Sequence, residues 1–182
     1  LALDMFAVLF GGAVAMLPIF ASEILLVGPV GLGWLRTATS LGAMVGGLTL
    51  IRYPIRRQSG YALLACVAGF GLCMIGFALS RSFVLSLCIL ALGGAFDSVS
   101  VVIRGAIVQL MAPKEMRGRI GAVNSMFINT SNQLGEFESG VAASFMGVVP
   151  SVVAGGCATL GVVALMFWKA PELRKMHLSQ FD

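Results

Sequence analysis

The segment FINTSNQLGEFESG, residues 127–140, places amides and carboxylates inside otherwise apolar sequence. At 3.6 residues per turn, Asn129, Asn132 and Glu136 fall on one face of a helix, and Glu138 lies about 200° away from Glu136. The first face also contains Ser125 and Gly140, and the second contains Asn124 and Ser131. Such groups can bind a polar ligand or a proton, or they can join one helix to another.

Three more ionisable residues interrupt apolar blocks, namely Asp4, Arg36 and Asp97. Asp97 is followed by Ser100 at i+3 and Arg104 at i+7, which predicts a polar strip along one helix. A carboxylate there could bind substrate or a coupling proton, or it could be held by a helix terminus or an arginine. The candidates for substrate binding or proton coupling are therefore Asp97, Glu136, Arg36, Asn129, Asn132, Glu138 and Asp4.

The elements that carry these residues are expected to cross a membrane. Hydrophobic residues make up 58% of the chain and charged residues 11%, which is more apolar surface than 182 residues can bury in a soluble domain. A membrane span needs roughly 20 apolar residues. Six such blocks lie at about 1–22, 31–51, 60–80, 83–103, 120–148 and 149–168. We expect an all-α integral membrane protein, with one six-helix lobe over 1–168 and a cytoplasmic tail over 169–182.

The links between blocks alternate in their content of lysine and arginine. The links at 52–59 and 104–119, together with the tail, contain ten of these residues, whereas the opposite side contains only Arg81. Short cytoplasmic loops are enriched in Lys and Arg. The pattern therefore predicts a multi-pass protein of the cell inner membrane, whose first helix runs outward and whose C-terminus is cytoplasmic.

The polar residues are distributed unevenly among the blocks. Blocks three and six carry no ionisable residue between their ends, whereas the other four do. This favours two inverted three-helix repeats, in which the third helix of each faces lipid and the others line a cavity or an interface. In the second block, Gly42 and Gly46 have the G-x-x-x-G spacing that permits close helix contact or a bend.

Other classes of protein find less support. The four cysteines, all within apolar blocks, have no metal-type spacing, so no metal and no cofactor is expected. The basic residues have a membrane explanation, so no nucleic-acid partner is expected either. The single histidine, His177, lies in the tail, which leaves no Ser–His dyad for an intramembrane enzyme. A receptor or a structural membrane protein remains an alternative.

The fourth link carries the most specific motif. It reads APKEMRGRIGAVNS, and Pro113, Glu115, Arg117, Gly118 and Arg119 match a Pro-x-Glu-x-Arg-Gly-Arg run. Here the chain resembles the C-terminal half of a major facilitator superfamily transporter, in which such a run follows the tenth helix. The stretches LDMFAVLFGGAVAMLPIFA and VVIRGAIVQL are similar to the seventh and tenth helices of the drug and siderophore exporters in this superfamily, especially enterobactin-exporter-like members.

The resemblance implies what the rest of the protein would be. The six blocks would be helices seven to twelve of a twelve-helix fold that works by alternating access, powered by a proton gradient. The partners would be a small-molecule substrate, the lipid bilayer and a missing N-terminal six-helix lobe. Because the chain begins without Met and inside apolar sequence, we expect a piece of something longer. The link RYPIRRQSG keeps the basic residues of a superfamily loop motif but lacks its Asp, which favours ordinary cytoplasmic arginines at Arg56 and Arg57.

The depth of two charged residues in the membrane predicts an ion pair. Arg36 lies about two turns from the outer end of its helix, and Glu136 lies about 24 Å from an inner end near Ile120. Both fall in the outer half of the membrane, where an unpaired charge is costly. We therefore predict that Arg36 pairs with Glu136 in at least one transport state.

Overall fold

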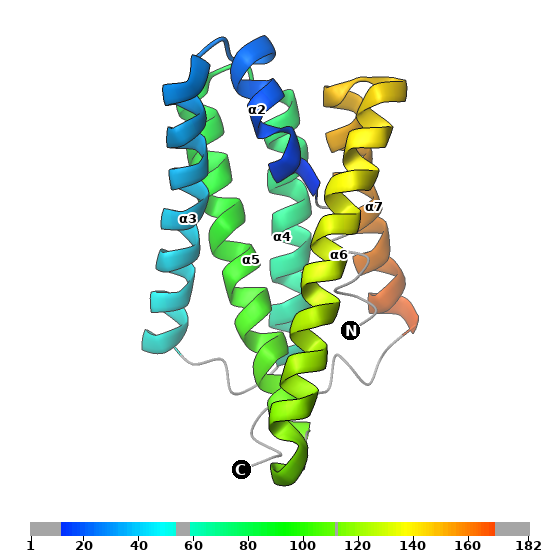
Figure 1. Cartoon of the computed structure of the whole chain (residues 1–182). Helices are drawn as coiled ribbons and strands as arrows, with labels where there is room; N and C mark the ends of the chain where they lie inside the picture. Colours follow the sequence, from blue (N-terminus) through cyan, green and yellow to red (C-terminus); the bar gives the residue numbers. More distant parts are fainter. Residues whose placement is uncertain (1–11, 54–58, 112, 170–182) are drawn as a thin grey trace.

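The computed structural model describes residues 12–53, 59–111 and 113–169, and all regular structure in these ranges is helical (Figure 1). Long helices extend over α3 (Gly28–Arg52), α4 (Ser59–Leu79), α5 (Phe83–Met111), α6 (Arg117–Met146) and α7 (Val148–Lys169). A short 3-10 turn, η3 (Lys114–Met116), precedes α6. These helices overlap the predicted blocks two to six. The described part of the chain is therefore all-α, as predicted.

The first block is described only from Gly12 onward, and it is an irregular helix. It consists of a 3-10 segment, η1 (Gly12–Met16), a short α2 (Leu17–Ile19) and a π segment, η2 (Phe20–Ile24). Pro18 lies at the junction, where its missing N–H disturbs the regular hydrogen-bond ladder. The Ser22 hydroxyl donates to the Pro18 carbonyl oxygen at 3.0 Å. The 3-10 segment η1 packs against α6.

Within the described ranges, three helices are long and apolar enough to cross a membrane, namely Gly60–Leu79, Phe83–Gln109 and Val148–Lys169. Helices α3 and α6 are long enough but do not meet this measure, because glycine, hydroxyl, amide and charged residues interrupt their apolar sequence. The predicted number of six spans therefore stays a prediction.

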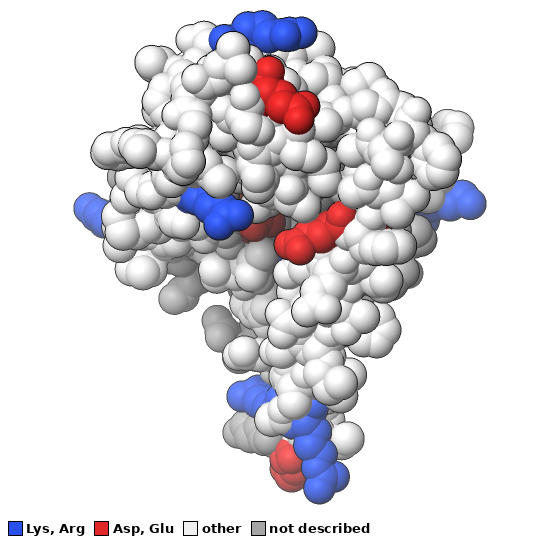
Figure 2. Space-filling view, turned by 45° about the horizontal axis from the view of Figure 1, so that its top comes forward, with Lys and Arg blue, Asp and Glu red and all other residues white. Residues whose placement is uncertain are grey.

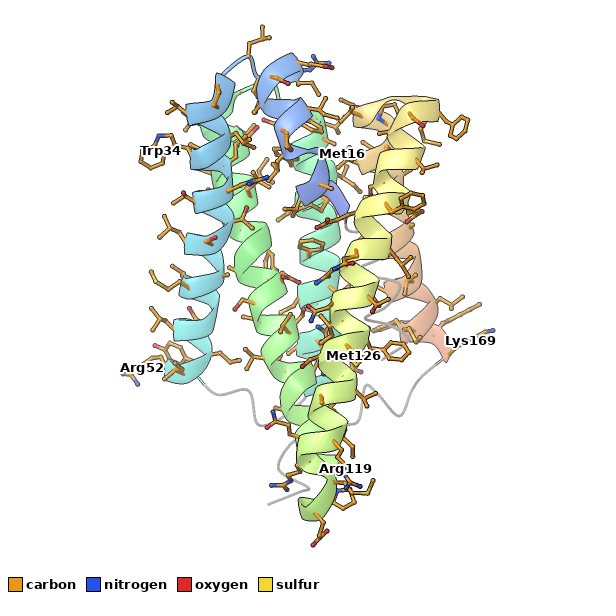
Figure 3. All side chains as sticks on the ribbon, viewed as in Figure 1. Met16, Trp34, Arg52, Arg119, Met126 and Lys169 are labelled. Carbon is orange, nitrogen blue, oxygen red and sulfur yellow. The ribbon has the colours of Figure 1, made fainter. Side chains whose placement is uncertain are left out.

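Most of the described basic residues lie toward one end of the bundle, with Arg36 and Arg81 as exceptions. The chain runs alternately down and up through α3 to α7 (Figure 1). Figure 2 shows a group of charged side chains at the lower tip of the molecule, and Figure 3 places Arg52, Arg119 and Lys169 at the lower ends of α3, α6 and α7. This is the grouping that the alternating links predicted. Residues 170–182, which include the predicted tail, lie outside the described residues.

Helices α3 and α5 approach each other most closely. A Cβ atom added at Gly42 would collide with the backbone carbonyl oxygen of Ala91, and one added at Gly94 would collide with that of Thr39. At Gly46 the same atom would meet Ala95. Small residues let helix backbones approach in this way within a membrane. The close contact predicted from the Gly42 and Gly46 spacing is confirmed.

Two apolar clusters join the remaining helices. Near the upper end, Phe20 packs on Phe77 with ring centroids 4.6 Å apart, and Leu35 and Leu90 are buried beside them. Toward the lower end, Leu63, Leu64, Val67 and Ile103 form a second cluster. Helix α4 packs on both α5 and α7, whereas α6 packs mainly on η1 and α7. Among the described residues, the main packing partners of α6 are therefore η1 and α7.

Candidate functional site

Helix α6 has three faces, and the first packs inside the molecule. Its buried residues are Ser131 and Gly135, and the flanking Asn124 and Glu138 are partly buried. These four lie within about 60° of one another around the helix at 100° per residue. The second stripe expected from the sequence is thus the packed face of α6.

The second face is polar and exposed. Asn129, Asn132 and Glu136 are all exposed, as is Ser125 below them. They are centred about 120° from the packed face at 100° per residue. In a helix within a membrane, amides and a carboxylate facing outward from the bundle require water or another protein. We refer to Ser125, Asn129, Asn132 and Glu136 as the polar face of α6.

The third face is apolar and even more exposed. Phe145 is 85% exposed, Phe137 71% and Leu134 53%. In Figure 3, ring side chains project from α6 on the side away from α5. This face, which also includes Val123, Phe127 and Val141, is suited to lipid tails. Helix α6 therefore lies at an edge, where an apolar surface meets a polar one.

Asp97 is exposed on α5, but the strip below it is not. Ser100 and Arg104 are only 4% and 8% exposed, and the Ser100 hydroxyl donates to the Asp97 backbone carbonyl oxygen at 2.9 Å. Because α5 continues to Met111, Arg104 lies inside the helix rather than in the cytoplasmic link where the sequence placed it. The predicted strip exists, but it runs from an exposed carboxylate into the interior of the bundle.

Arg36 is exposed on α3, and it has a polar neighbour that the sequence reasoning missed. The Ser40 hydroxyl, also exposed, donates to the Arg36 carbonyl oxygen at 3.2 Å. The i, i+4 spacing of these two residues on one helix face was the available signal. Within the described ranges no ion pair joins Arg36 to Glu136, so their pairing in another transport state stays a prediction.

Arg36, Asp97 and Glu136 are exposed charged residues on three different helices. Figure 2 shows acidic and basic side chains around a hollow in one face, with uncharged surface around them. Arg36, Asp97 and Glu136 come from α3, α5 and α6, and together they offer one cation, two carboxylates and the neighbouring amides. Such a set can bind a polar solute by charge and hydrogen bonds, and it can exchange a proton.

The other predicted residues lie elsewhere. Pro113, Glu115, Arg117, Gly118 and Arg119 are exposed in and after η3 at the lower end, away from the hollow. Asp4 lies outside the described residues. Among the residues that the structure places, no three histidine, cysteine, aspartate or glutamate side chains are grouped to hold a metal ion.

Comparison with known proteins identifies the family. Residues 3–181 match the family described as transmembrane secretion effectors. The chain is 28% identical over 146 residues to the enterobactin exporter EntS of Shigella flexneri, and equally to that of Escherichia coli O1:K1. These alignments cover 80% of this chain but 36% and 35% of the two relatives, so the chain spans about a third of their length. No solved structure gives a significant match.

Proposed function

Because the chain belongs to the transmembrane secretion effector family of major facilitator superfamily transporters, we propose that it forms one lobe of a proton-coupled exporter of a small molecule. The lobe comprises helices seven to twelve, and an N-terminal lobe completes the transporter. The substrate is a siderophore or a drug-like compound, and alternating access of two lobes moves it outward. The similarity of this chain to the two enterobactin exporters supports export rather than import.

One observation carries the proposal, namely the exposure of the polar face of α6 together with that of Asp97 on α5 and Arg36 on α3. Lipid would penalise these groups, whereas a water-filled path between two lobes would solvate them. The apolar face of the same helix indicates where lipid begins. An isolated receptor bundle needs no such polar surface at the depth of the membrane.

Flux in everted inner-membrane vesicles tests the proposal. Vesicles that contain the full-length protein are prepared with an acidic interior. They should accumulate a catecholate siderophore or a fluorescent drug while the proton gradient is present, and accumulation should stop when the gradient is collapsed. Vesicles without the protein provide the control. Specific binding of the same compounds with no flux in either direction would replace the exporter with a receptor.

The proposed orientation gives a separate prediction. With the basic ends cytoplasmic, a cysteine placed at Lys114 in the full-length protein should be shielded from an impermeant thiol reagent added to intact cells. Cysteines at Pro29 and Val149 should react, because both positions lie at the upper ends of their helices. Permeabilised cells control for reactivity. Labelling of Lys114→Cys alone in intact cells would mean that the protein is inserted the other way.

A further inference from the structure

Glu138 has a buried carboxyl oxygen that nothing satisfies. Its Oε2 atom is enclosed by protein and has no hydrogen-bond partner among the described residues. Its neighbours on the packed face of α6, Ser131 and Gly135, are buried, and that helix packs mainly on η1 and α7. Glu136 lies two residues away in sequence but on the opposite side of the helix, and it is exposed. Glu136 is therefore exposed, whereas Glu138 is partly buried and has one carboxyl oxygen enclosed by protein.

No described cation lies near Glu138 along the elements that pack on α6. The segment η1 contains no titratable residue from Gly12 to Met16, and α7 contains only Cys157 and, at its lower end, Lys169. Helix α5 contributes Asp97 and the low-lying Arg104, and the link before α6 contributes Lys114 and Glu115. On α6 itself the charged residues are Glu136 and, at the lower end, Arg117 and Arg119. Glu138 lies eight residues from the upper end, about 12 Å.

The free-energy cost of burying Glu138 Oε2 depends on the charge state of the carboxyl group. A carboxylate oxygen that is buried without a hydrogen bond or a counter-charge makes the ionised form unfavourable, and uptake of a proton relieves this cost. A neutral carboxylic acid carries no charge, so the cost is only that of one polar group without a hydrogen bond. The partly buried Asn124 has a similarly unpartnered Oδ1 on the same face, but an amide has no comparable choice of charge.

We propose that Glu138 is a proton-binding site at the contact of α6 with η1 and α7, separate from the polar face, and that it holds its proton in this conformation. Release of the proton requires water at Oε2, hence a separation of α6 from η1 and α7. The part of this inference that concerns transport rests on the proposed function, whereas the protonation of Glu138 rests only on its surroundings.

Labelling by dicyclohexylcarbodiimide tests the proposal, because this apolar reagent adds to protonated carboxyl groups. The acid proton moves to a carbodiimide nitrogen, the carboxyl oxygen bonds to the central carbon, and rearrangement gives a stable N-acylurea without a leaving group. An ordinary glutamate with a pKa of about 4.3 is protonated at pH 7 in only about one molecule in 500. In the purified full-length protein at pH 7, peptide mass spectrometry should therefore find the adduct on Glu138 and not on Glu136.

The control variants keep the test independent of transport. Glu138→Gln copies the neutral acid, so it should fold as the parent does and lose the adduct, whereas Glu136→Gln should leave the adduct unchanged. Labelling of Glu136 in preference to Glu138 would overturn the proposal. Loss of folded protein in Glu138→Gln would also overturn it, because it would mean that an ionised carboxylate holds the bundle together. The labelling and folding results do not depend on whether the vesicles transport a substrate.

Discussion

Replacing Gly42 with alanine should strongly destabilise the lobe, although alanine is the better helix former. In an exposed helix position, glycine to alanine is expected to stabilise by up to about 1 kcal/mol. At Gly42 the added methyl group collides with the carbonyl oxygen of Ala91, and a backbone atom of a packed helix cannot move aside. Forcing extra volume into such a contact typically costs about 1–3 kcal/mol. Thermal unfolding of the full-length protein in detergent should show a melting temperature lower by several degrees.

Gly33 supplies the matched control on the same helix. A Cβ atom added there meets nothing within 4 Å, so Gly33→Ala should leave the melting temperature unchanged or raise it. Gly46→Ala should behave like Gly42→Ala, because it would meet Ala95. Equal melting temperatures for Gly33→Ala and Gly42→Ala would mean that α3 and α5 do not pack through these glycines.

Neutralising Asp97 should reduce transport far more than it reduces the amount of protein. The side chain is exposed on α5, so Asp97→Asn keeps the shape and removes only the charge. Losing one hydrogen bond to a charged group costs about 1.5–3 kcal/mol, which corresponds to a reduction of roughly ten- to a hundredfold. Flux into everted vesicles should fall by about this factor, while the membrane level of the variant should stay near that of the parent.

Glu115→Gln controls for the loss of a carboxylate, because Glu115 is exposed in the lower link before α6. It should transport nearly as the parent does. If Asp97→Asn transports normally across a range of pH, Asp97 has no part in the mechanism. If Asp97→Asn instead fails to reach the membrane, the carboxylate has a structural role.

The helix faces of α6 could be predicted because they depend only on residue type and spacing. Asn129, Asn132 and Glu136 share an exposed face, and Ser131 lies on the packed one, as the period of 3.6 requires. The sequence could not tell which stripe packs, since both contain amides and a carboxylate. That choice is made by η1 and α7, and it separates Glu138 from the polar face.

Other features could not be predicted from the sequence, for physical reasons. The end of α5 was placed too early because Arg104 was taken as the start of a polar link, whereas the helix continues for two more turns and buries this side chain. A long basic side chain can extend its polar end away from apolar surroundings, so a charge need not end a membrane helix. The spacing of Gly42 and Gly46 predicted that α3 makes a close helix contact. It did not predict that the partner is α5, because the spacing on one helix does not identify the helix opposite.

Cysteine reactivity along α6 tests most directly whether the polar face lines a water-filled path. In a full-length protein without its native cysteines, single cysteines at Asn129, Asn132 and Glu136 should react with a small water-soluble thiol reagent. Cysteines at Leu134, Phe137 and Val141, on the apolar face, should react poorly, because thiols in lipid are not ionised and are not reached by the reagent. Reactivity should therefore rise and fall with the helical period. Strong labelling of the apolar face together with an unreactive polar face would contradict the account.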